Sequence, residues 1–325
     1  MDTVGIVVIG RNEGDRLRRC LLSVRGTAAA VVYVDSGSSD GSPELAAALG
    51  ADVVRLDLSR PFTAARARNT GFRRLRQVRP GVEFVQFVDG DCEVAPGWPA
   101  AAAAALAGPD GTAVVCGRRR ERFPEATVWN RLCDLEWDTP VGEADACGGD
   151  AMMRVTAFEA VGGFREGLIA GEEPELCHRL RAAGWKVRRL AADMTLHDAA
   201  MTRAAQWWTR AIRAGHAFAE CHWLHRDGPV PMWRREVRGV VFWGLLMPLA
   251  AAALTAAMPW GLLYPAAVLL SAALVFRRRL RRDPVRSAAL FAAGCAAAKV
   301  PQAVGLLSFH IRRVLGRPRG LIEYK

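Results

Sequence analysis

Short apolar runs alternate with amphipathic segments through the first two thirds of the chain. Runs rich in Val, Ile or Phe are typical of buried strands, and they occupy residues 5–9, 30–34, 51–56, 84–88 and 113–116. Segments with apolar residues at helical spacing or with helix-start signals lie between them, at 15–24, from Pro43 onward and at 63–78. Strands that alternate with helices of this length predict an α/β domain with a mostly parallel, doubly wound sheet.

Acidic residues follow the carboxyl ends of these predicted strands. Asp35 and Asp40 follow the second strand, while Asp89 and Asp91 flank Gly90 after the fourth. Because ligands bind outside the carboxyl ends of strands in such sheets, we expect one crevice to collect these side chains. Two carboxylates around a glycine suit a divalent cation that also holds phosphate. The alternative for each Asp is a structural role in capping a turn or helix.

The composition changes abruptly after Arg238. Residues 239–258 and 260–276 are uncharged, and basic residues flank the pair on both sides. Their lengths and flanks predict a membrane hairpin with both ends cytoplasmic, turning at 258–261. A third apolar stretch, 287–309, contains Lys299 and Pro301 and predicts a re-entrant or interfacial segment. The alternative is a buried helical subdomain.

The charge distribution and the cysteines indicate where in the cell the protein works and what it binds. Ten of the eleven net positive charges lie in residues 277–325, so the rest of the chain is nearly neutral. This distribution argues against a nucleic-acid-binding face and favours contact of the tail with anionic lipid headgroups. The eight cysteines include no C-x-x-C pair, which is poor evidence for a disulfide framework or zinc ribbon and fits a reducing cytosol. With no basic leader before the first strand, we expect a protein of the cell inner membrane or plasma membrane with a cytoplasmic catalytic domain.

Seven motifs, taken in order, make the chain resemble the family 2 glycosyltransferases of the GT-A fold. They occupy residues 9–13, 34–41, 67–71, 89–91, 148–150, 161–164 and 171–176. The resemblance covers roughly residues 4–197. It implies an inverting transfer of a sugar from a nucleotide donor to a hydroxyl group, assisted by Mg²⁺ or Mn²⁺.

The resemblance also implies which residues form the site. The nucleotide sugar would be bound by Asn12, Glu13, Asp35, Arg68, Asp89, Gly149 and Asp150. The metal would be bound by Asp91, with Asp89 and His197 as further ligands.

Inverting transfer also needs a base to accept the proton of the acceptor hydroxyl. Pro174 is tolerated in the first turn of a helix, so Glu172 and Glu173 stand at a helix entrance. The resemblance assigns the base to Glu173, at a position where the family more commonly has Asp. Because Glu is longer by one methylene, Glu172 is the alternative base. An ordinary acidic first turn, favoured by the helix dipole, is the structural alternative.

We expect a glycosyltransferase domain over residues 1–235 and a hydrophobic membrane anchor with a basic tail over 236–325. Linker helices at 200–235 would lie at the membrane interface or pack against the main sheet. Residues 118–122, with four arginines, predict a solvated loop or a contact for an anionic acceptor.

The expected acceptor is lipid-linked or membrane-proximal, as in polysaccharide, glycolipid or cell-envelope biosynthesis. Two rival functions stay open. One is a non-catalytic membrane protein with a GT-A-like binding domain. The other is a GT-A nucleotidyltransferase, which would need a longer, basic Gly-rich loop after the first strand than residues 10–14 supply.

Overall fold

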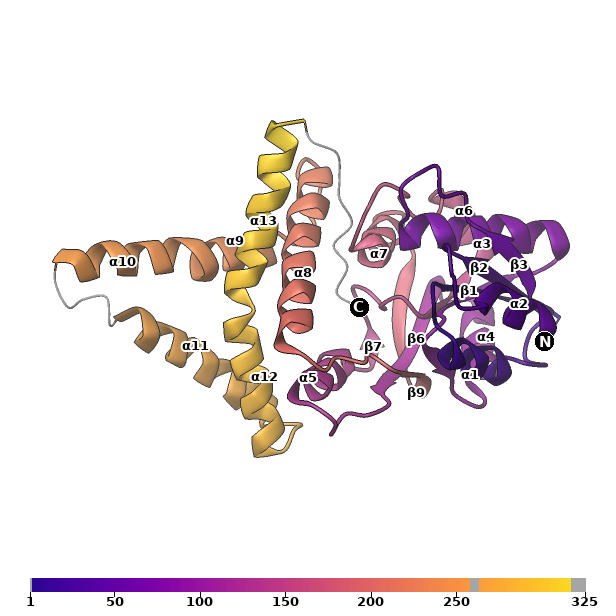
Figure 1. Cartoon of the computed structure of the whole chain (residues 1–325), viewed down its shortest axis with the longest axis horizontal. Coiled ribbons are helices and arrows are strands. Elements are labelled where there is room, and N and C mark those ends of the chain that lie inside the picture. The colour runs from indigo at the N-terminus through magenta and orange to yellow at the C-terminus, as the bar shows by residue number, and fades with distance from the viewer. Residues whose placement is uncertain (1, 258–262, 317–325) are drawn as a thin grey trace. The chain divides into compact units, whose positions relative to one another are not determined.

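The computed structural model describes residues 2–257 and 263–316 (Figure 1). The chain forms two compact units. The first contains Met1–Arg122 and Trp137–Ala199, and the second contains Phe123–Glu136 and Ala200–Lys325. Residues 200–235, which we assigned to the glycosyltransferase domain, are therefore grouped with the C-terminal helices.

Four parallel strands form one half of the sheet in the first unit. They are β1 (Val4–Gly10), β2 (Ala30–Asp35), β3 (Asp52–Arg55) and β4 (Phe84–Asp89), in the order β3-β2-β1-β4. Val and Ile side chains of β1 are fully buried on both faces, as expected for a parallel strand covered by helices. The first four predicted strands are thus confirmed.

The other half of the sheet is mixed, with both parallel and antiparallel pairs. Its strands are β5 (Cys92–Val94), β6 (Thr112–Glu121), β7 (Gly142–Glu143), β8 (Ala151–Arg154) and β9 (Lys186–His197). β8 lies between β4 and β6 and is antiparallel to both, whereas β6 and β9 are parallel. The sequence of β8, Ala-Met-Met-Arg, lacks the β-branched and aromatic residues that mark strands, so its pattern gave no signal.

Helices cover the sheet of the first unit. They are α1 (Asp15–Ser23), α2 (Ser42–Ala48), α3 (Ala64–Val78), α4 (Trp98–Ala107), α6 (Val155–Ala160) and α7 (Glu172–Ala182). α1 buries Leu17, Cys20 and Leu21, which confirms the helical spacing of its sequence. α3 packs on β1 and β2, and the hydroxyl of its N-cap, Thr63, accepts a hydrogen bond from the Arg66 backbone N–H.

The second unit is helical. Its elements are α5 (Val128–Trp137, whose last residue belongs to the first unit), α8 (Ala204–Leu224), α9 (Arg234–Val241), the π-helix η1 (Phe242–Leu246), α10 (Met247–Ala257), α11 (Leu263–Arg279), α12 (Val285–Ala297) and α13 (Lys299–Val314). α8 and α13 lie side by side (Figure 1). In α8, Trp207 is buried and its ring lies 5.2 Å from that of Trp129, whereas Trp208 is exposed. This helix therefore packs within its own unit.

Two helical segments in the described part of the chain are long and apolar enough to cross a membrane: Arg234–Leu254 and Val285–Val314. The first overlaps the predicted span at 239–258, but the predicted turn at 258–261 lies outside the described residues. The second predicted span corresponds to the shorter α11. Residues 287–309, predicted to be re-entrant or interfacial, are part of the 30-residue segment Val285–Val314.

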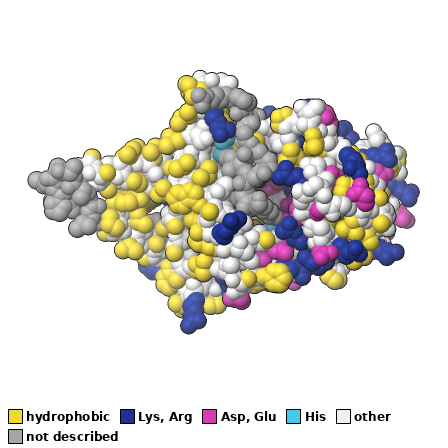
Figure 2. All heavy atoms as spheres, in the orientation of Figure 1, with side chains coloured by type: hydrophobic (Ala, Val, Ile, Leu, Met, Phe, Trp, Pro, Cys, Tyr) yellow, Lys and Arg dark blue, Asp and Glu magenta, His cyan; other side chains and the backbone are white. Residues whose placement is uncertain are grey.

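Hydrophobic side chains are exposed over these C-terminal helices (Figure 2). The strongly exposed leucines on α10 and α11 are Leu249, Leu254, Leu263, Leu269, Leu270 and Leu274. Only 6% of the Arg234–Leu254 window is buried inside the protein. A contiguous apolar surface of this kind marks contact with a membrane or a partner.

Candidate active site

The strand register brings the predicted acidic residues to one edge of the sheet. Gly10, at the end of β1, is paired with Asp35 at the end of β2, and Ile9 is paired with Asp89 at the end of β4. The carboxyl ends of three adjacent parallel strands therefore meet. This edge is where the sequence placed a ligand crevice.

The loops after β1 and β2 are tied together by Asn12. Its backbone N–H donates to Ser38 Oγ at 2.9 Å, and its side-chain oxygen accepts from the Ser39 N–H at 2.8 Å. Asp35 is buried, and its Oδ2 accepts from the backbone N–H groups of Gly37 and Ser38 at 3.0 Å each. Asn12 and Asp35 thus shape the wall that was predicted to face the nucleotide.

Asp40 and Glu13 complete this wall. Asp40 accepts hydrogen bonds from the backbone N–H groups of Gly14 and Ser42, so its role is the capping role given as an alternative. Glu13 forms an ion pair with Arg16 at 2.9 Å. A Cβ on Gly90 would lie 3.3 Å from the Glu13 side chain and 3.1 Å from the Ile9 carbonyl oxygen, so a larger residue would crowd this turn.

Strand pairing places His197 against Asp91. β5 begins directly after Asp91, and its first residue, Cys92, is paired with His197 in antiparallel β9. His197 Nε2 lies 3.2 Å from Asp91 Oδ2, and both side chains are nearly fully buried. Nδ1 of His197 has no hydrogen-bond partner among residues 2–257 and 263–316.

The imidazole of His197 is in the form that binds metals. Burial, together with the nearby Arg119 cation, lowers the pKa of His197 to about 4. The ring is therefore neutral at neutral pH and retains a lone pair. An aspartate oxygen and an imidazole nitrogen are suitable donors for Mn²⁺, so this pair fits the predicted divalent cation.

Arg68 bridges two acidic residues of the site. Its guanidinium lies 2.7 Å from Asp89 Oδ1 and 2.8 Å from Glu172 Oε1, and its side chain is 3% exposed. Burial opposes the charge, but Asp89 and Glu172 raise the pKa of Arg68 above its ordinary value. A Cβ on Gly149 would lie 2.7 Å from this guanidinium, so glycine is needed for the close approach.

Asp150 lies beneath this layer and is fully buried. It accepts a hydrogen bond from the Asp89 backbone N–H at 3.0 Å and another from the Thr195 hydroxyl at 2.9 Å. Arg119 forms an ion pair with it at 3.0 Å. Asp150 therefore holds β4 and β9 together next to the site.

The prediction of a loop at residues 118–122 was wrong. β6 extends to Glu121, and Arg118 and Glu121 are buried. Arg119 faces Asp150 and lies over the Trp137 ring at 5.5 Å. Sequence reasoning missed Arg119 because a run of arginines looks like a solvated segment, although alternate residues of a strand point to opposite faces.

The two acids at the start of α7 occupy different environments. Glu172 is held by Arg68. Glu173 is 2% exposed, and its carboxylate accepts from the backbone N–H groups of Cys147 at 2.7 Å and Gly148 at 2.8 Å. Burial raises the pKa of Glu173; the Cys177 thiol and the two N–H groups oppose this shift, and the charge of Glu172 adds to it.

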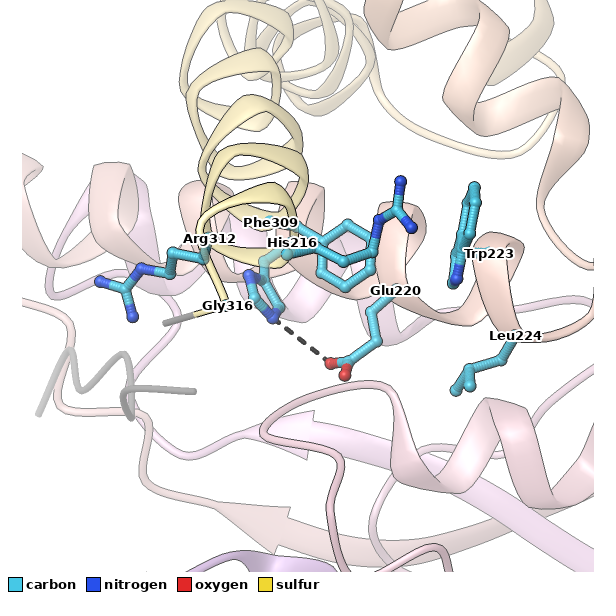
Figure 3. A pocket seen from close by; sticks show the side chains of 8 residues that line it. His216, Glu220, Trp223, Leu224, Phe309, Arg312 and Gly316 are labelled. Atoms are coloured by element: carbon cyan, nitrogen blue, oxygen red, sulfur yellow. Dashed lines mark ion pairs between the residues drawn. The ribbon is translucent and has the colours of Figure 1, made fainter. Parts of the chain in front are cut away.

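A separate cavity of about 460 Å³ lies in the second unit (Figure 3). His216 and Glu220 of α8 form its buried polar end, with His216 Nε2 3.3 Å from Glu220 Oε2. Arg312 and Arg313 of α13 also line it. None of its lining residues belongs to the acidic site on the sheet, so we do not assign it to the nucleotide.

Comparisons with known proteins agree with this geometry. The family model described as "Glycosyl transferase family 2" matches residues 5–162. A pre-mycofactocin glycosyltransferase of Mycobacterium tuberculosis is 27% identical over 243 residues, which cover 70% of this chain and 49% of that protein. The chain thus spans about half the length of the curated relatives it matches first.

A solved structure shows the same fold. The mannosyltransferase PcManGT from Pyrobaculum calidifontis, in complex with GDP-Man and Mn²⁺, superposes with a TM-score of 0.56 at 21% sequence identity. The match covers 97% of this chain and 87% of that one. Residues 5–162 thus match the glycosyl transferase family 2 model, and the α/β unit has the GT-A fold.

Proposed function

We propose that this protein transfers a sugar from a nucleotide-sugar donor to a hydroxyl acceptor with inversion at the anomeric carbon. The observation that carries the proposal is the convergence of Asp35, Asp89 and the Asp91–His197 pair at one edge of the sheet. The similar mannosyltransferase binds GDP-Man and Mn²⁺, and the mycobacterial relative is named as a glycosyltransferase. Both support a nucleotide-sugar donor here.

Asp91 and His197 would hold Mg²⁺ or Mn²⁺. When bound, such an ion neutralises the charge of a leaving diphosphate. Asp89 Oδ1 accepts a hydrogen bond from Arg68. Asp89 would therefore contact the metal ion or the ribose through the lone pairs that this bond leaves open. Asn12, Glu13 and Asp35 would form the nucleotide wall, and Gly149 would border the sugar. The prediction that Asp150 contacts the nucleotide sugar does not fit its full burial, and it would instead support the site from beneath.

Glu173 would act as the base. The acceptor oxygen attacks the anomeric carbon, the bond to the diphosphate breaks, and the acceptor proton passes to the carboxylate. The raised pKa of Glu173 suits a group that must accept a proton near neutral pH. Glu172 is the weaker candidate because its Oε1 accepts from the cationic Arg68 at 2.8 Å, whereas among the described residues Glu173 accepts only from neutral donors.

The acceptor would be lipid-linked or close to the membrane. The exposed leucines of α10 and α11 support a membrane-bound second unit, and the flanking arginines support a cytoplasmic active site at the inner or plasma membrane. The cavity beside His216 and Glu220 lies in that unit.

The test is turnover by the purified full chain in detergent with UDP-, GDP- and dTDP-sugars, Mn²⁺ and a membrane lipid extract. We expect one donor to release nucleoside diphosphate together with a glycosylated lipid of inverted anomeric configuration, read by NMR. Retained configuration would overturn the inverting mechanism. Formation of nucleotide sugar from sugar phosphate and nucleoside triphosphate would instead identify a nucleotidyltransferase.

A further inference from the structure

Two cysteines lie next to the Glu173 carboxylate. Cys177 lies one turn after it on α7, and its Sγ is 2.9 Å from Glu173 Oε1. Cys147, in the loop before β8, places its Sγ, the Cys177 Sγ and a Glu173 oxygen within 4.8 Å of one another. Cys116 of β6 also interacts electrostatically with Cys147. Glycosyl transfer requires no thiol, so the proposed mechanism leaves this cluster unused.

The donor set differs in chemistry from the Asp91–His197 pair. Two sulfurs and one carboxylate oxygen match three corners of a tetrahedral site whose fourth ligand is water, and Zn–S bonds of about 2.3 Å put neighbouring ligand atoms roughly 3.5–4 Å apart. Thiolates are soft ligands that select Zn²⁺ over Mg²⁺ and Mn²⁺. The spacing of the cluster therefore requires only small shifts to close around such an ion.

We propose that Cys147, Cys177 and Glu173 form a binding site for Zn²⁺, and that an ion bound there inhibits sugar transfer by occupying the base. The inhibitory part rests on the proposed function of Glu173. Coordination through Oε1 leaves Oε2 bound to the Gly148 N–H, so the carboxylate stays in place but no longer accepts a proton.

The surroundings support such an ion. Cys147 is half-buried, which gives the ion a path from solvent, whereas Cys177 is buried. Binding releases the thiol protons to solvent and leaves a negatively charged site. Arg119 interacts electrostatically with Glu173, so its guanidinium group offsets part of this charge.

The competing explanation is that the cysteines only fill space, since buried free cysteine packs as a small hydrophobic residue. Titration of the full chain, first freed of metal by a chelator, with Co²⁺ and Cd²⁺ distinguishes a metal site from cysteines that only fill space. We expect one ion per chain with thiolate-to-metal charge-transfer absorption that excess Mn²⁺ does not remove. Zn²⁺ should displace the Co²⁺ and raise the unfolding temperature. No charge-transfer band in the wild-type chain would overturn the site.

Cysteine variants locate the ion. We expect Cys147→Ser and Cys177→Ser each to weaken Co²⁺ binding at least about tenfold. Cys295→Ser is the matched control because Cys295 is also half-buried but lies in the second unit. Equal binding by Cys147→Ser, Cys177→Ser and the control would place the ion elsewhere and contradict the proposal.

The inhibitory step is tested separately, with each variant compared with its own metal-free rate. We expect Zn²⁺ to inhibit wild-type turnover and to inhibit Cys147→Ser at least about tenfold more weakly. Equal inhibition of both would overturn the regulatory part alone. Zinc binding by a chain with no turnover under any condition would refute the proposed function and leave the metal site standing.

Discussion

At the scale of single residues, Arg68 is the cation that joins the two halves of the site. Its buried guanidinium forms ion pairs with Asp89, at the end of β4, and with Glu172, at the start of α7. A buried charge needs such partners, because its desolvation is otherwise costly. Glu172 is therefore held in an ion pair with Arg68, whereas Glu173 is hydrogen-bonded only to neutral groups in the part of the chain that the structure describes.

The difference between Glu172 and Glu173 gives a direct prediction. Glu173→Gln keeps the size of the side chain but removes the group that accepts the proton, so we expect transfer to fall by about 10²–10⁴-fold with nucleotide affinity unchanged. Turnover and nucleotide titration measure the two effects. Glu172→Gln is the matched variant on the same helical turn, and a larger loss of transfer in Glu172→Gln than in Glu173→Gln would move the base by one residue.

The sequence predicted the position of a residue correctly where that residue lies at the end of a strand. The placement of Asp35 and Asp89 at one edge follows from strand order and register alone. Arg119 was missed because its strand continued beyond the apolar run. The cluster at Cys147 was also missed, since its thiols are brought together only by long-range packing of a loop and α7.

At the scale of elements, α8 and α13 approach closely through two glycines. A Cβ on Gly215 would overlap the Gln302 carbonyl oxygen, and a Cβ on Gly305 would overlap the Ile212 carbonyl oxygen. Small residues permit such backbone contact between helices. The apolar pattern of 287–309 predicted a helix-length segment, but only the structure reveals the partner helix against which its glycines pack.

We expect Gly305→Ala to destabilise the protein because the added methyl group forces the two backbones apart. The loss should be about 1–3 kcal/mol, as for other overpacking substitutions, and appear as a lower unfolding temperature in detergent. Gly239→Ala in α9 is the control, since a Cβ there meets nothing within 4 Å. Equal unfolding temperatures for the two variants would contradict the close helix contact.

At the scale of the whole molecule, the chain combines a GT-A unit with a helical unit that exposes leucines along α10 and α11. The sequence predicted the α/β part from its alternating strands and helices, and the helical part from the change in composition after Arg238. The boundary between the two parts was predicted near residue 235, where the long apolar segments begin. Hydropathy reveals such segments but does not reveal which helices pack together. The amphipathic α8 instead groups with the C-terminal helices.

Membrane attachment through these helices predicts a position-specific effect of charge. We expect Leu249→Arg in α10 to lower the fraction of protein that stays in carbonate-washed membranes, because an arginine near the centre of a span costs about 2.5–3.5 kcal/mol. Leu58→Arg is the control in the first unit, since Leu58 and Leu249 are both 60% exposed. Release of the wild-type chain by the wash would contradict membrane insertion.

The central claim is that Asp91 and its neighbours form a metal-dependent nucleotide site, and a thermal-shift screen tests it most directly. Folded full-length protein in detergent is heated with UDP, GDP, dTDP or CMP, with and without Mn²⁺. We predict that one nucleotide raises the unfolding temperature only with Mn²⁺, by the equivalent of about 2.7 kcal/mol at a hundredfold excess over Kd. Asp91→Asn should lose this shift. A flat response of the folded wild-type chain to all four nucleotides would contradict the account and favour a non-catalytic membrane protein.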